Sequence, residues 1–182
     1  MSTDIDGWIE VWDEYAEAWR AVMVVNNTLV DQDYDVFGLL FGVRNYAGFE
    51  PVAPARGAPL DASRQVLATM PAEEDEYASG HTWITLAEIK AIDPNMSGAT
   101  LEVYTFEPGP DGELVEMKHR SMEPKIKEDG AEWLEGDKLF RVRRTRAAVL
   151  YEDTGWDRLI RIMEILAEKY DDQRIRMVVW FD

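Results

Sequence analysis

Cysteine is absent from the 182 residues of this chain, and histidine occurs only twice. The lack of cysteine excludes disulfides, zinc–thiolate sites and cysteine nucleophiles together, and it is typical of a reducing compartment. No apolar run approaches the roughly 20 residues that a membrane-spanning helix needs, and the start Met1–Asp6 is acidic where a signal peptide carries positive charge. We therefore expect a cytoplasmic protein with no membrane contact.

Basic side chains are also few: 19 lysines and arginines stand against 36 aspartates and glutamates, which gives a formal net charge of −17. Residues 1–89 hold 16 acidic and 4 basic side chains, a net charge of −12, and residues 90–182 hold 20 and 15, a net charge of −5. A surface this negative repels phosphates, so no direct contact with nucleic acid is expected. The surplus either keeps the protein soluble or imitates a nucleic acid and binds the basic surface of another protein.

Recognisable catalytic and cofactor-binding motifs are missing as well. The sequence contains no phosphate-binding loop, dinucleotide fingerprint, Gly-x-Ser-x-Gly elbow or paired-histidine metal helix. No cofactor and no metal are therefore predicted, and a binding protein is favoured over an enzyme.

The hydrophobic patterns predict an α+β fold in a single domain, residues 1–182, built on a mainly antiparallel sheet that contains both termini. Residues 4–12 alternate as a half-buried strand does, with every second residue apolar. The apolar run 19–25 pairs with this strand in a hairpin, although a helix over 14–24 also fits. Further strands are predicted over 101–106, 114–118 and 174–182, whereas the polar residues 119–137 show little periodicity and place His119 at the surface.

About three helices are predicted to pack on this sheet. One begins near Val36 with Asp33 or Asp35 as its cap. A second follows Thr85, which has Glu88 three residues later, the spacing of a capping box. The clearest apolar stripe runs over 156–170 with Thr154–Gly155 as its cap. A shorter helix ends at Met70. The tryptophans expected mostly between sheet and helices are Trp8, Trp12, Trp83, Trp156 and Trp180.

The segment Gly80–Glu88 is the leading candidate for a site, because it places His81 beside Trp83 at the start of a helix. Histidine exchanges protons near neutral pH, so His81 is a candidate general acid or base. Asp4 and Asp6 lie about 7 Å apart on one strand face, where they can orient the histidine, hold a cation or simply be solvated.

Candidate ligand contacts come from separate segments. Arg44 and Asn45 follow the helix near Val36, and Arg56 lies in the loop region 50–80. An arginine binds an anionic group through two parallel hydrogen bonds, so with Trp83 these residues predict a site for a nucleotide-like small molecule. Arg44 and Asn45 can instead satisfy the carbonyl groups at the helix end.

Two charged runs complete the candidates. Glu73, Glu74, Asp75 and Glu76 form an acidic run that either contacts a basic partner or is only solvated. The basic cluster over 139–146 either neutralises nearby carboxylates or binds an anion. Its members are Arg141, Arg143, Arg144 and Arg146.

Several segments, in order along the chain, resemble a family of uncharacterised proteins common in bacteriophages, especially those of actinobacteria. The segments are Met1–Val11, Asp33–Leu40 with Val43–Asn45, Pro54–Gly57 with Leu60–Ser63, His81–Glu88 and Arg174–Asp182. The family start reads Met-Gly-Cys-Asp-Ile-His, and this chain has Thr3 and Asp6 where the family has Cys and His. His81 likewise remains alone where the family often has two histidines before the tryptophan.

The resemblance implies an origin and no mechanism, because no activity is assigned to the family. It favours a small acidic phage-encoded accessory protein, non-enzymatic, that binds a host protein or defence component in the host cytoplasm. The alternative is a small-molecule-binding or hydrolytic enzyme in which Asp4, Asp6, Arg44, Asn45, Arg56 and His81 converge.

Overall fold

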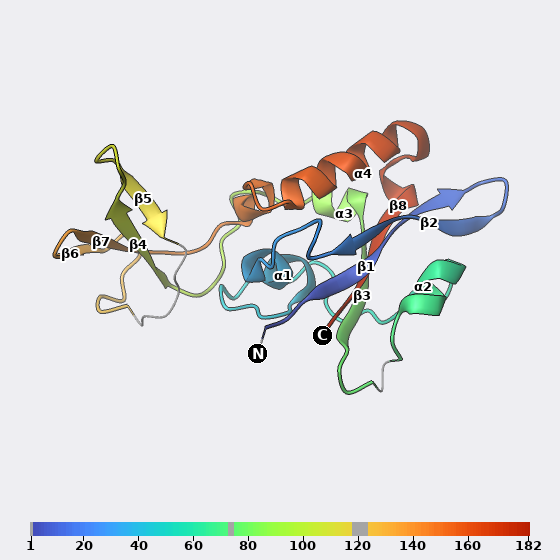
Figure 1. The fold of residues 1–182 in the computed structure, drawn as a ribbon, viewed down its shortest axis with the longest axis horizontal. Coiled ribbons are helices and arrows are strands. Elements are labelled where there is room, and N and C mark those ends of the chain that lie inside the picture. The colour runs from blue at the N-terminus through green and yellow to red at the C-terminus, as the bar shows by residue number, and fades with distance from the viewer. Residues whose placement is uncertain (1, 73–74, 118–123) are drawn as a thin grey trace.

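The computed structural model describes residues 2–72, 75–117 and 124–182 and has two four-stranded antiparallel sheets, which confirms the α+β prediction. The strand order is β2-β1-β8-β3 in the first sheet and β5-β4-β7-β6 in the second. Figure 1 shows the second sheet at one end of an elongated molecule, apart from the first. The strands predicted over 101–106 and 114–118 therefore belong to a sheet of their own.

The first sheet consists of β1 (Ile5–Asp13), β2 (Ala18–Asn26), β3 (Ser79–Thr85) and β8 (Ile175–Phe181). β1 and β2 form the predicted hairpin, so the alternative helix over 14–24 is wrong. β8 lies between β1 and β3, and all of its residues are buried. The two ends of the described chain lie side by side (Figure 1), because the Asp4 N–H donates to the Asp182 carbonyl at 3.2 Å.

One face of the first sheet packs against α1 (Tyr34–Phe41), α3 (Leu86–Lys90) and α4 (Trp156–Tyr170). The rings of Phe37 in α1 and Phe181 in β8 meet at a centroid distance of 5.1 Å. Burial of apolar area on this face is the main favourable contribution to folding. The strand residues that form the face are at most 2% exposed, and they are Ile5, Ile9, Val11, Ile175, Met177, Val179 and Phe181.

Two of the three predicted helix caps are confirmed. The Asp33 side chain accepts hydrogen bonds from the first N–H groups of α1, and Thr85 with Glu88 makes both hydrogen bonds of the capping box at α3. The cap predicted from Thr154 is wrong, because Gly155 precedes α4 with a φ of 85° and no side-chain hydrogen bond caps the helix. A Cβ at Gly155 would lie 2.7 Å from the Leu29 carbonyl oxygen, so this close approach needs glycine directly before the helix.

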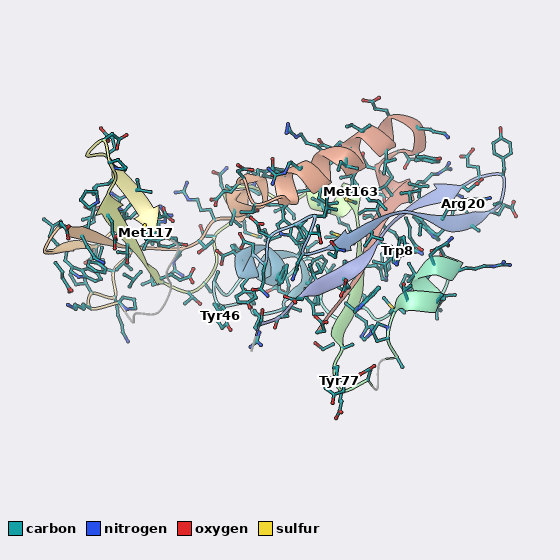
Figure 2. All side chains as sticks on the ribbon, viewed as in Figure 1. Trp8, Arg20, Tyr46, Tyr77, Met117 and Met163 are labelled. Carbon is teal, nitrogen blue, oxygen red and sulfur yellow. The ribbon has the colours of Figure 1, made fainter. Side chains whose placement is uncertain are left out.

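The opposite face of the first sheet carries the strand tryptophans and the short helix α2 (Arg64–Thr69) (Figure 1). The strand register places Trp8, Trp12, Trp83 and Trp180 on this face. Figure 2 shows Trp8 on the α2 side of the sheet and Met163 on the α4 side. Of the predicted interface tryptophans, only Trp156 lies between the sheet and the long helices. The cause is the phase of β1, whose smaller apolar side chains alternate with the tryptophans and face the core.

A buried ion pair lies at the centre of this tryptophan face. Arg176 Nε donates to Glu10 Oε2 at 2.7 Å, and the two residues are 3% and 0% exposed. The chain before α2 covers the pair: Arg176 Nη1 donates to Asp61 Oδ1 at 2.8 Å, and the Ser63 N–H donates to Glu10 Oε1 at 2.7 Å. The guanidinium also lies 3.9 Å from the ring centroid of Trp19. These contacts hold residues 61–69 against the sheet.

The second sheet consists of β4 (Glu102–Pro108), β5 (Leu114–Met117), β6 (Glu132–Glu135) and β7 (Lys138–Arg143). β6 lies in the polar stretch for which no strand was predicted. Its two apolar residues are Trp133 and Leu134, and Trp133 stacks on Phe140 of β7 at a centroid distance of 5.2 Å. His119 lies outside the described residues. Within the described ranges, no helix combines the length and apolar character needed to cross a membrane.

We expect the Glu10–Arg176 pair to dominate the response of this fold to mutation. Arg176→Met leaves the Glu10 carboxylate buried without its cation and lowers the free energy of unfolding by about 3–5 kcal/mol. Glu10→Leu combined with Arg176→Met recovers much of that loss, because no buried charge remains. Urea unfolding at neutral pH measures the free energy of unfolding of the two single variants, Glu10→Leu and Arg176→Met, and of the double variant. A double variant whose loss equals the sum of the two single losses would show that the pair does not act as a unit.

Candidate functional site

Three carboxylates meet where β1 begins and β8 ends. Asp4 and Asp182 pair through backbone hydrogen bonds of 3.2 and 3.4 Å, and Asp6 lies two residues further along the same strand. Because side chains alternate along a strand and paired residues share a face, all three project from the tryptophan face. Asp4, Asp6 and Asp182 form the carboxylate corner.

The carboxylates of the corner are unpaired in the described part of the chain: no ion pair there includes Asp4, Asp6 or Asp182. A neutral amide contacts the first of them, because Gln32 Nε2 donates to Asp4 Oδ1 at 2.8 Å. Burial raises the pKa of the Asp6 carboxyl, and the charges of Asp182 and Asp4 raise it further. A raised carboxyl pKa in such surroundings marks a candidate for binding a positive charge.

Apolar side chains adjoin the carboxylate corner on the same face. Trp8 follows Asp6 in phase along β1 and pairs with Val24 of β2, which is 42% exposed. The Trp8 indole N–H donates to Thr69 Oγ1 at 2.9 Å, so the ring is held beside the end of α2. A lysine or arginine side chain can lay its apolar stem on such a surface while its charge meets carboxylates.

Arg44 and Asn45 have structural contacts on the other side of this corner. Arg44 Nε donates to Thr3 Oγ1 at 2.9 Å. Asn45 closes the turn that follows α1, since its Nδ2 donates to the Phe49 carbonyl at 2.7 Å and its Oδ1 accepts from the Phe49 N–H at 2.9 Å. The structure thus brings Arg44 near the start of β1, whereas both amide atoms of Asn45 are used within the turn.

His81 lies on the far side of β8 from Asp4 and Asp6. The flanking strands β1 and β3 are separated by about 10 Å, twice the strand spacing, and no hydrogen bond within the described residues joins His81 to either aspartate. His81 is 6% exposed, and its Nε2 lies 3.1 Å from the Pro71 carbonyl oxygen. A carbonyl only accepts, so this nitrogen carries the proton. The ring anchors the chain that enters β3.

Arg56 and Trp83 are brought together further along β3. The Arg56 guanidinium lies 5.0 Å from the Trp83 ring centroid and donates to both Glu88 oxygens, at 2.7 and 3.1 Å. Burial raises the pKa of the Glu88 carboxyl, but the hydrogen bonds and charge of Arg56 and the hydrogen bonds of Thr85 together outweigh it, so the pKa is lowered. The arginine predicted to bind an anionic ligand therefore already holds a carboxylate of the chain itself.

The acidic run is described only in part. Glu73 and Glu74 lie outside the described residues, and Asp75 and Glu76 are exposed in the loop before β3. Asp75 Oδ1 accepts a hydrogen bond from the Tyr77 N–H at 2.9 Å, as in a local turn.

Arg143, Arg144 and Arg146 line a cavity of about 870 Å³ between the second sheet and residues 31–35. Arg143 donates to both Glu116 oxygens at 2.8 and 3.0 Å, and Arg141 pairs with Glu132 at 2.5 Å. Arg146 is exposed and belongs to no ion pair within the described ranges. Arg144 also lies 3.7 Å from Asp129, so three of the four predicted arginines pair with carboxylates and Arg146 is left facing the cavity.

Sequence analysis missed Asp182 and Trp8 as parts of a site. Asp4 and Asp6 were identified from their spacing on one strand, and the same alternation places Trp8 in phase with them. Asp182 joins only because β1 and β8 pair, a contact that no local pattern reveals. No group of three or more histidine, aspartate or glutamate side chains in the described part of the chain has an arrangement suited to a metal ion.

The chain matches no protein-family model, no curated protein and no solved structure. The site is therefore interpreted from its own geometry.

Asp6→Asn is expected to stabilise the folded protein at neutral pH. The folded state raises the pKa of Asp6, so its contribution is most favourable at low pH and is lost as pH rises through that pKa. The asparagine variant therefore gains about 0.5 kcal/mol or less at pH 7, as is usual for a solvent-screened surface substitution, and gains nothing in acid. Thermal unfolding across pH measures this difference. Glu128→Gln, an exposed neutralisation away from the corner, is the control and should show no such pH-dependent gain.

Proposed function

We propose that this protein is a non-enzymatic accessory protein that binds the basic surface of another protein. The carboxylate corner receives the partner's cationic side chains, and Trp8 with Val24 contacts their apolar stems. In the setting implied by the resemblance to phage proteins, the partner is a host or defence component in the cytoplasm.

The observation that carries this proposal is the uncompensated charge of the corner. Elsewhere in the described residues, cations pair closely with carboxylates, as Lys90 does with Asp172 at 2.7 Å and Arg56 with Glu88 at 2.7 Å. At the corner, by contrast, three carboxylates repel one another beside an exposed apolar patch. A partner's cation relieves that repulsion, so binding energy is gained at this place and not at the paired ones.

Binding is favoured over catalysis because the candidate acid–base groups are engaged separately. His81 contacts the Pro71 carbonyl across β8 from the corner, and Arg56 holds Glu88. General acid–base catalysis needs a proton donor or acceptor within about 3 Å of the reacting group. These side chains surround no common point in the described structure.

A triple neutralisation tests the proposal. The immobilised Asp4→Asn/Asp6→Asn/Asp182→Asn variant should lose the basic proteins that the parent retains from a bacterial lysate at about 50 mM salt and releases at about 500 mM. The loss follows from removal of the three carboxylates of the corner, which form no ion pair within the described residues.

The matched control is Glu113→Gln/Glu128→Gln/Asp137→Asn, which changes the net charge by the same amount on the second sheet. Equal losses from both triple variants would mean that total charge, and not the carboxylate corner, retains the partners. Full retention by the corner variant would contradict the proposal.

The cavity between the second sheet and residues 31–35 supports a second candidate function, the binding of a small anionic molecule. Arg146 lines the cavity without an ion-pair partner in the described residues, and Tyr104 also lines it, with the Arg143 guanidinium 3.8 Å from its ring centroid. A nucleoside monophosphate has both the charge and the ring for such a site.

Arg146→Glu should then weaken the binding of adenosine monophosphate by about tenfold or more, the usual effect of losing a hydrogen bond to a charged group. Ligand-observed NMR measures the change. Arg161→Glu on the exposed side of α4 is the matched control, and an equal effect of the two substitutions, or no binding to the parent, would remove this candidate.

A further inference from the structure

We infer that the partner of the carboxylate corner enters as an extended basic segment that adds a strand to the first sheet along Val22–Val25 of β2. The inference rests on the proposed function and specifies how the partner binds. The partner's strand would pair with the backbone of the sheet edge next to the corner.

β2 is an outer strand with an open edge. It is the first strand in the order β2-β1-β8-β3, and its only strand partner in the described residues is β1. Hydrogen bonds of the Val22–Val25 backbone to any other described segment are absent. Outward N–H and C=O groups of such an edge are a template for another strand.

The side chains of this edge are apolar, whereas most outer strands carry charged side chains that prevent pairing with another strand. Val22 and Val24 are 48% and 42% exposed. The charged side chain of β2 is Arg20, which lies in the other half of the strand and pairs with Asp13 at 2.5 Å. It therefore does not protect Val22–Val25. The register shift between Ile9 and Glu10 leaves Val22 without a partner on β1, because Ile9 pairs with Met23 and Glu10 with Ala21. Val22 thus marks the boundary between the Arg20 half of β2 and the half that ends at Val25.

Charge complementarity identifies the occupant as basic. Val25 and Asn26 pair with Gly7 and Asp6, so the open half of the edge ends beside the carboxylate corner. A second copy of this chain would bring a further charge of −17 to the same place, which disfavours self-association through this edge. An extended segment with lysine at alternate positions places its cations on the tryptophan face, toward Asp4, Asp6 and Asp182, and lays their apolar stems along Val24 of the same face.

The test uses the soluble heptapeptide Lys-Val-Lys-Val-Lys-Val-Lys and a form of it with methyl groups on alternate backbone nitrogens. Both carry the same charges, but the methylated form cannot donate backbone hydrogen bonds from one edge. Titration calorimetry should show that the methylated form binds the parent protein about tenfold more weakly or worse, because several hydrogen bonds are lost. Amide hydrogen exchange should show peptide-dependent protection within 22–25 and none within 18–20.

Val22→Lys/Val24→Lys should reduce peptide affinity by about tenfold or more through like-charge repulsion at the edge. Leu67→Lys/Ile165→Lys, which converts two exposed apolar residues elsewhere, is the matched control and should bind as the parent does. Far-UV circular dichroism and sedimentation show whether each variant is folded and monomeric.

The outcomes separate the two proposals. Equal binding of both peptides, lost in the Asp4→Asn/Asp6→Asn/Asp182→Asn variant, would overturn strand addition and leave the proposed function intact. If the parent bound neither peptide, that result would contradict strand addition and also the proposal that the carboxylate corner binds a basic segment. If the amides of residues 22–25 became protected from hydrogen exchange at higher protein concentration without peptide, a second copy of the chain would be the strand that pairs with this edge. That result would contradict the inference.

Discussion

The buried ion pair between Glu10 and Arg176 is the constraint on which the rest of this structure depends. It joins residues separated by 166 positions, one in the first strand and one in the last. Two charges removed from water are tolerated only when further hydrogen bonds satisfy them. Asp61 and Ser63 supply such bonds, and for that reason the loop before α2 is drawn over the middle of the tryptophan face.

The cover over the ion pair decides which parts of the tryptophan face stay open. Residues 61–69 occupy the half of the face that carries Glu10 and Arg176, and α2 ends beside Trp8. Where β1 begins and β8 ends, Trp180 is buried, but Asp4 and Asp182 are exposed and Asp6 is half-buried. The carboxylate corner and Val24 therefore remain accessible as a consequence of how the fold satisfies a charge pair elsewhere in the sheet.

Local chemistry was predictable from the sequence, and long-range pairing was not. The capping box of Thr85 and Glu88 and the alternation in β1 depend on residues a few positions apart, so the sequence alone is sufficient for them. β6 escaped prediction because its four residues carry one aromatic side chain in a polar stretch. In the candidate site, Asp4 and Asp6 were found by their spacing, whereas Asp182 joins them only through the pairing of the two terminal segments.

The same pairing brings three carboxylates to one place, although carboxylates are spread over the whole chain. Salt bridges formed within the second sheet and around the helices neutralise acids next to their basic neighbours. No ion pair among the described residues involves the aspartates at the ends of β1 and β8, so the sheet brings the three together with the Gln32 amide bonded to Asp4. Much of the net charge of −17 is spread over the surface, whereas the carboxylate corner holds three carboxylates, unpaired among the described residues, in a fixed geometry. Electrostatic binding is specific where such fixed charges meet complementary ones.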